Sequence, residues 1–233
     1  MRREYLENFI WLVIGLAILA SLIGLVRYRR LPRSLRYVAL LACFDMLMEL
    51  TAKFTKEALH LKSNLFLFPL VSIGELVLLG LAYRQALQSV AFGRVLPWVL
   101  GAFSAYALFI SFSQFATAHY AVGIATLVNL LVLGLAGLYF RKLLNELQVE
   151  NLRRDPFFWL SVGLAVYGLG NLLISLFYNY LITHYSEQLQ LFVLWGVRNL
   201  FNVLLYLAYC WALWIAPPKG LSEPAATRIP GRA

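Results

Sequence analysis

The sequence predicts an all-α fold: a bundle of seven transmembrane helices, with the N-terminus outside and the C-terminus in the cytoplasm. Hydrophobic residues make up 61% of the 233-residue chain and charged residues only 13%, a balance unlike that of soluble domains. Apolar runs long enough to cross a bilayer recur from end to end. Lysines and arginines gather in alternate connections between these runs, which predicts the orientation.

The apolar runs divide into seven predicted spans, at about 8–27, 36–57, 64–84, 95–115, 119–141, 156–181 and 189–215. They form one membrane domain over residues 1–216, and residues 217–233 are predicted to be a disordered cytoplasmic tail. The first run is too long for a signal peptide, and Arg27, Arg29 and Arg30 follow it in place of a cleavage site. We therefore expect it to be retained as the first span.

Helix start and stop signals support several boundaries. Pro32 separates the first two spans, and Ser63 can cap the third. Asp155 followed by Pro156 is a cap with proline at the first helical position. Ser186 suits the start of the seventh span.

The segment 141–155, RKLLNELQVENLRRD, is too polar to span a membrane. We expect it to extend the fifth helix into the cytoplasm or to lie on the membrane surface. It is either a solvated connector or the contact for a cytoplasmic partner.

Basic residues predict which ends of the spans face the cytoplasm. Most lie in the 1–2, 3–4 and 5–6 connections and in the tail: Arg27, Arg29, Arg30, Arg33, Arg36, Arg84, Arg94, Arg141, Lys142, Arg153, Arg154, Lys219, Arg228 and Arg232. The positive-inside rule then places these connections in the cytoplasm. The net charge of +9 is explained by these topology signals and by contacts with anionic lipid. No basic face with exposed aromatics is left for nucleic acid, which we exclude as a partner.

The second predicted span carries a stripe of ionisable side chains. Its members are spaced by three or four positions and so share one helix face: Asp45, Glu49, Lys53, Lys56 and His60. Ionisable groups at membrane depth normally face a bundle interior or a wet cavity. The stripe therefore marks the place to look for function.

Other spans add polar residues at similar depth. On the seventh span a shared face holds Trp195, Arg198 or Asn199, Asn202 and Tyr206. On the sixth span Tyr167, Asn171 and Tyr178 share one. The candidate ligand-binding set or charge network is Asp45, Glu49, Lys53, Glu75, Asn129, Asn171, Arg198, Asn199 and Asn202.

Three carboxyl groups and one guanidinium near the midplane leave excess negative charge if all are ionised, which is costly when buried. We expect Arg198 to hold one carboxylate in a forked pair, with Glu75 as the preferred partner. The other carboxyls are then protonated, paired with Lys53 or hydrated. One reading is a pocket open to the outside. The alternative is that these groups fix helix register without any ligand.

The histidines and cysteines are weaker candidates for functional residues. His60, His119 and His184 lie near predicted outer helix ends and are weaker candidates for a zinc site, because no HxxxH or HExxH pair is present. Cys43 and Cys210 fall inside spans and are predicted to be packing residues. No cofactor and no catalytic motif are predicted.

Three stretches carry a resemblance: Asn64 to Arg84 with its mid-helix Glu75, Asp155 to Phe177, and Leu194 to Trp214. They resemble uncharacterised bacterial seven-helix integral membrane proteins, which are similar to the membrane sensor regions of some histidine kinases. The resemblance implies a sensor in a bacterial cytoplasmic (inner) membrane. The lack of a kinase domain implies that its output passes through a partner.

The expected function is therefore a stand-alone membrane sensor that responds to an unknown small ligand and signals to a cytoplasmic or membrane partner. A proton- or cation-coupled transporter using the same carboxylates is the alternative. A zinc-dependent membrane hydrolase is less favoured, and an enzyme of any kind is not the preferred reading.

Overall fold

The computed structural model describes residues 3–57, 67–113, 122–146 and 152–217, and within these ranges the chain is helical with no strand. The elements are α1 (Arg3–Arg27), α2 (Arg33–Glu57), α3 (Phe68–Leu87), α4 (Val90–Ser113), α5 (Val122–Glu146), the 3₁₀ turn η2 (Leu152–Arg154), α6 (Pro156–His184), α7 (Glu187–Leu191), the π-helical segment η3 (Phe192–Val197) and α8 (Arg198–Ile215). The prediction of an all-α fold is confirmed.

Six helical stretches of the described chain are long and apolar enough to cross a membrane: Phe9–Arg27, Phe68–Leu87, Val90–Phe112, Val122–Asn145, Pro156–His184 and Gln188–Ile215. They match six of the seven predicted spans and indicate an integral membrane protein. The remaining predicted span, 36–57, lies in α2, which has 25 residues but also carries the ionisable stripe. α2 is long enough to cross a membrane, but it is more polar than the six apolar helices.

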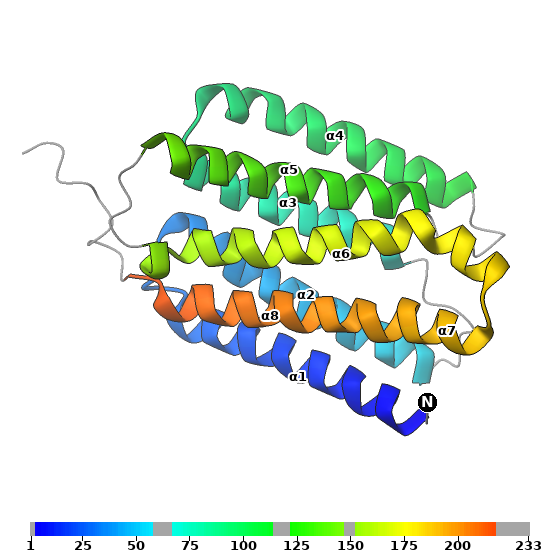
Figure 1. Ribbon diagram of the computed structural model, residues 1–233. Helices are drawn as coiled ribbons and strands as arrows, with labels where there is room; N and C mark the ends of the chain where they lie inside the picture. Colours follow the sequence, from blue (N-terminus) through cyan, green and yellow to red (C-terminus); the bar gives the residue numbers. More distant parts are fainter. Residues whose placement is uncertain (1–2, 58–66, 114–121, 147–151, 218–233) are drawn as a thin grey trace, which may run out of the picture.

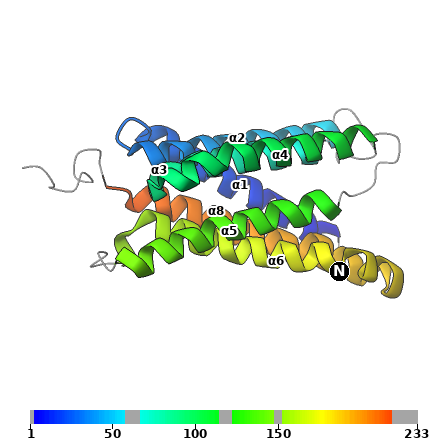
Figure 2. The ribbon, with the colours of Figure 1, turned by 90° about the horizontal axis from the view of Figure 1, so that it is seen from above.

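The long helices run side by side, with the start of α1 at one end of the molecule and the end of α8 at the other (Figure 1). Successive packing contacts join α1 to α2, α2 to α3, α3 to α5, α5 to α6, α6 to α8 and α8 back to α1. These six helices therefore form a ring. The remaining long helix, α4, packs against α3 at the edge of the molecule (Figures 1 and 2).

Small residues and lipid-facing side chains explain this packing. Ala17, Ala20 and Ala42 are buried where helices meet, as expected when close backbone approach stabilises membrane helices. Large apolar side chains instead cover the outside, with Trp98 81% and Phe112 80% exposed. An apolar exterior of this kind suits contact with lipid.

The helix ends near the basic connections are held by side chains of other helices. Arg27 donates hydrogen bonds to the carbonyl oxygens of Leu213 (2.6 Å), Ala216 (2.8 Å) and Trp214 at the end of α8. Lys142 of α5 donates to the Ala86 carbonyl near the end of α3 (2.8 Å). Because the last carbonyls of a helix lack partners within it, these cations stabilise both ends.

Asp155 caps α6 as predicted. Its Oδ1 accepts a hydrogen bond from the Phe157 amide (3.0 Å), Pro156 is the first helical residue, and Oδ2 accepts from the Tyr139 hydroxyl (2.5 Å). Ser186 is likewise the N-cap of α7, but its side chain makes no capping bond.

Other boundary predictions have mixed outcomes. The predicted cap Ser63 lies outside the described residues, and α3 begins at Phe68 with Leu67 at the N-cap. The start of the polar segment 141–155 extends the fifth helix to Glu146, as expected. The predicted seventh span is not a single α-helix, because the π-helical η3 interrupts it. The predicted tail lies outside the described residues from position 218 onward.

Candidate functional site: a polar cavity inside the helix ring

A cavity of about 380 Å³ lies between α2, α3, α6, η3 and α8. A smaller cavity of about 110 Å³ adjoins it on the side of α5. The residues common to both linings are Asp45, Glu49, Phe68, Val71, Glu75, Arg198, Asn202 and Tyr206. Because they share so much of their lining, we treat the two as one site and call it the polar cavity.

The α2 side of the polar cavity carries two of the predicted carboxyl groups. Asp45 and Glu49 line it together with Met48 and Ala52, as the three- and four-residue spacing requires. Asp45 is only 4% exposed, and its Oδ1 is buried without a hydrogen-bond partner among the described residues. An unsatisfied buried oxygen of this kind costs about 1–3 kcal/mol, so its retention needs a reason.

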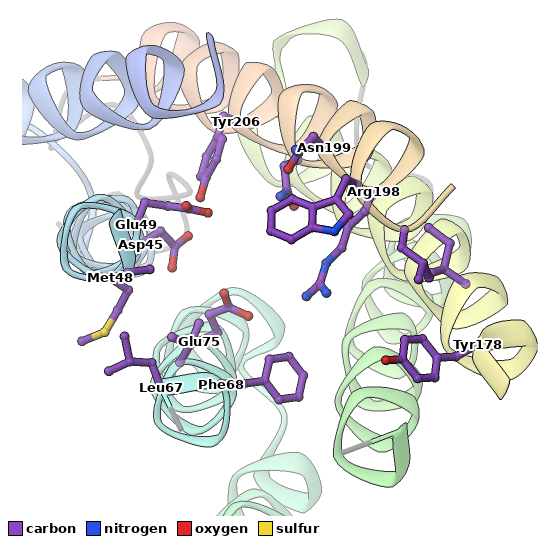
Figure 3. Close-up of a pocket in the computed structure, with 16 residues that line it drawn as sticks. Asp45, Met48, Glu49, Leu67, Phe68, Glu75, Tyr178, Arg198, Asn199 and Tyr206 are labelled. Atoms are coloured by element: carbon purple, nitrogen blue, oxygen red, sulfur yellow. The ribbon is translucent and has the colours of Figure 1, made fainter. Parts of the chain in front are cut away.

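Glu75 and Arg198 complete the charged lining from α3 and α8. The side chains of Asp45, Glu49 and Glu75 converge on one space, and the Arg198 guanidinium points into it from α8 (Figure 3). The Arg198 guanidinium lies near Glu49 and Glu75, and its Cζ is 6.0 Å from the ring centroid of Phe68. The forked pair of Arg198 with Glu75 stays a prediction.

All four predicted asparagines reach the polar cavity. Asn199 and Asn202 line it from α8. Asn129 and Asn171 line its deeper part, and each donates an amide hydrogen back to its own helix, to the Ala125 carbonyl (2.7 Å) and the Tyr167 carbonyl (3.0 Å) respectively. These bonds orient both amides.

Lys53 is the one member of the predicted set that does not line the polar cavity. Its Nζ lies over the Trp11 ring of α1, 2.8 Å from the centroid, in a cation–π contact. The structure therefore directs this lysine toward α1. The side chain of Lys56 and the whole of His60 lie outside what the structure describes.

Aromatic rings form much of the remaining wall. Trp195, Tyr178 and Tyr206, which share helix faces with predicted polar residues, all line the polar cavity. Phe68 also lines it and was missed by the sequence analysis. A signal was present, since Phe68 precedes Glu75 by two helical turns and so shares its face.

The π-helical segment η3 ends immediately before Arg198. A π-turn holds one extra residue, so it changes the direction in which the following side chains point. Leu194 and Trp195 of this segment line the polar cavity next to Arg198. No pattern in the sequence predicts this π-turn.

The alternative metal set receives little geometric support. His184 is exposed at the end of α6, where its ring stacks on Tyr180 at 4.4 Å and its Nδ1 lies 2.7 Å from the Thr183 hydroxyl. His60 and His119 lie outside the described residues. Among the described residues, no three histidine, cysteine or carboxylate side chains come together to hold a metal.

The two cysteines lie in α2 and α8, and both contact α1. Cys43 Sγ accepts a hydrogen bond from Ser21 (3.3 Å), and Cys210 Sγ lies 4.0 Å from the Leu16 carbonyl oxygen. Both are free thiols.

Comparison with known proteins adds no relative: no family model, no curated protein and no solved structure matches the chain.

Proposed function

We propose that this protein is a membrane sensor that binds a small ligand in the polar cavity and passes the signal to a partner through α8. The proposed arrangement is a seven-helix bundle in a bacterial inner membrane, with the N-terminus outside and the C-terminus in the cytoplasm. A sensor is also the function that the resemblance to sensor regions of histidine kinases implies. In this orientation the polar cavity lies nearer the outer face.

One observation carries the proposal: ionisable groups from three helices meet in a cavity beside the π-helical start of α8. Buried charge networks can have two arrangements of similar energy, and a ligand favours the one it binds better. A π-turn can shift the register of the helix that follows it. A ligand that draws Arg198 toward or away from Glu49 and Glu75 would therefore move α8.

We propose that the C-terminal end of α8 transmits the signal to the partner. Arg27 links the last carbonyls of α8 to the end of α1. Movement of α8 changes this contact at the cytoplasmic end, where the basic connections are also placed. A partner that binds there would detect the change.

Hydrogen exchange of the purified protein in lipid nanodiscs tests this coupling. Glu75→Gln and Arg198→Ala are expected to change exchange at Phe192–Val197 and also at the end of α8. The control Arg84→Gln replaces a charge at the opposite end of α3, away from the polar cavity. Exchange at the end of α8 that is unchanged in both cavity variants would contradict the sensor proposal.

A proton-coupled transporter is the second candidate, and buried hydroxyl groups favour it. Tyr206 and Tyr209 of α8 are buried with their rings 6.0 Å apart. Farther along, the Tyr83 hydroxyl lies 2.7 Å from Ser161 Oγ, and Tyr139 donates to Asp155. Hydroxyl groups thus continue from the polar cavity toward the opposite end. Proton flux into proteoliposomes that is abolished by Tyr83→Phe would favour transport over sensing.

A further inference from the structure

We infer that the polar cavity binds a small organic cation, with its ammonium group against Asp45 and Glu75 and its apolar body against the aromatic wall. This inference rests on the proposed function, because it names the class of ligand that the sensor would detect. It also makes a chemical claim that can fail while the sensor proposal stands.

Charge balance is the first argument. The described lining of the polar cavity contains three carboxyl groups and one guanidinium. Mutual repulsion among Asp45, Glu49 and Glu75 is relieved when a positive group enters between them. An anionic ligand would instead compete with two glutamates for Arg198, the only cation in the described lining.

The second argument is the unsatisfied oxygen of Asp45. The Asp45 side chain lines the polar cavity and is only 4% exposed. Its Oδ1 has no hydrogen-bond partner among the described residues. In the ionised carboxylate this oxygen can only accept, so the group that would satisfy it is a hydrogen-bond donor. An ammonium group has three N–H donors and a positive charge, so it can bond to Asp45 and Glu75 at once.

The size and wall of the cavity distinguish an organic cation from a metal ion. A volume of about 380 Å³ lies within the usual range of small-molecule sites. Phe68, Trp195 and Tyr178 offer ring faces and edges to an apolar ligand body, and aromatic rings also attract cations. A bare metal ion needs several ligands close to one point, and among the described residues no three histidine, cysteine or carboxylate side chains come close enough together to hold one.

Binding of matched probes to the purified protein in nanodiscs tests the inference. The probes are 2-phenylethylamine, the neutral 2-phenylethanol and the anionic 3-phenylpropanoate, together with the butyl and indolylethyl members of each class. We expect the amines to bind and to raise the unfolding temperature, with the neutral and anionic counterparts at least about tenfold weaker. Stronger binding of the anions, saturable binding of zinc alone, or no amine binding up to about 10 mM would overturn it.

Variants locate the binding site. Asp45→Asn and Glu75→Gln should each weaken amine binding by about tenfold or more, since each removes a charged hydrogen-bond acceptor. Asp155→Asn removes a carboxylate at the other end of the molecule and should leave affinity unchanged. Trp195→Leu should weaken binding, whereas Trp98→Leu on the exposed face of α4 should not. Equal effects of the cavity and control variants would also overturn the inference.

The outcomes separate this inference from the sensor proposal. Amine binding without any change in hydrogen exchange at the end of α8 would uphold the cation site and contradict sensing. Binding of an anion that changes hydrogen exchange at the end of α8 would contradict the cation site and support sensing.

Discussion

At the scale of single residues, Asp155 performs two tasks with one carboxylate. One oxygen caps α6 through the Phe157 amide, and the other accepts the Tyr139 hydroxyl of α5. The first task is local and follows from the Asp-Pro pair. The second ties two helices together at the polar connection between them.

Asp155→Ala is expected to lower the free energy of unfolding by about 2 kcal/mol, the sum of a lost cap and a lost hydrogen bond from the Tyr139 hydroxyl. Asp155→Asn should cost less, because asparagine is also a good N-cap residue. Denaturant unfolding in detergent micelles, with Tyr139→Phe as the matched partner variant, measures both. Equal losses in the alanine and asparagine variants would refute the assigned capping role.

At the scale of helices, close approach depends on small residues at defined positions. A methyl group added at Gly163 of α6 would overlap the Ala208 side chain of α8, and one added at Gly170 would overlap the Phe201 ring. These two glycines therefore set the distance between the helix that carries Asn171 and the helix that carries Arg198.

Gly163→Ala is expected to destabilise the protein by about 1–3 kcal/mol, the usual range for overpacking, because α6 and α8 must separate. The control Gly134→Ala lies on α5, where an added methyl group meets no atom within 4 Å. It should be neutral or should stabilise the helix by up to about 1 kcal/mol. Thermal unfolding compares the two, and similar losses in both would show that α6–α8 packing is not the cause.

Arg27 fixes the end of α8 through the carbonyls of Leu213, Trp214 and Ala216. Arg27→Gln should increase hydrogen exchange in the last turn of α8 and lower stability by about 1.5–3 kcal/mol, the range for hydrogen bonds to charged groups. Arg30→Gln is the control, since Arg30 is exposed in the same connection. Unchanged exchange at residues 213–216 in the Arg27 variant would contradict this account.

At the scale of the whole molecule, the polar helix α2 decides the topology. It packs between α1 and α3 within the ring of helices, yet it is absent from the six apolar candidate spans. The free-energy cost of placing its ionisable groups in a membrane is lower when they face a cavity inside the ring. Asp45 and Glu49 do so.

If α2 crosses the membrane with the six apolar helices, the two ends of the chain lie on opposite sides. We expect a reporter at the C-terminus to be active in the cytoplasm and a cysteine introduced near the N-terminus to react with an impermeant thiol reagent outside. Cys43→Ala and Cys210→Ala remove the background. Labelling of both ends from the same side would show that α2 does not cross.

The sequence by itself determined the helical class, the positions of the long apolar spans and the Asp155 cap. The helices and spans follow from the length and polarity of contiguous segments, and the cap lies next to the helix that it caps. None of these features depends on which helices pack against each other. It also predicted that polar residues of five helices belong together, because helical periodicity and depth place them on inward faces.

Only the tertiary structure decided how these groups are used. Lys53 lies two turns beyond Asp45, and 3.6 residues per turn rotate it by about 80°, which is enough to aim it at Trp11 of α1. Three features depend on which helices become neighbours: the wall formed by Phe68, the approach of Arg198 to both Glu49 and Glu75, and the Asp45 oxygen that has no partner among the described residues. Helix order in the ring skips α4 and joins α3 to α5, a choice made by packing between distant segments.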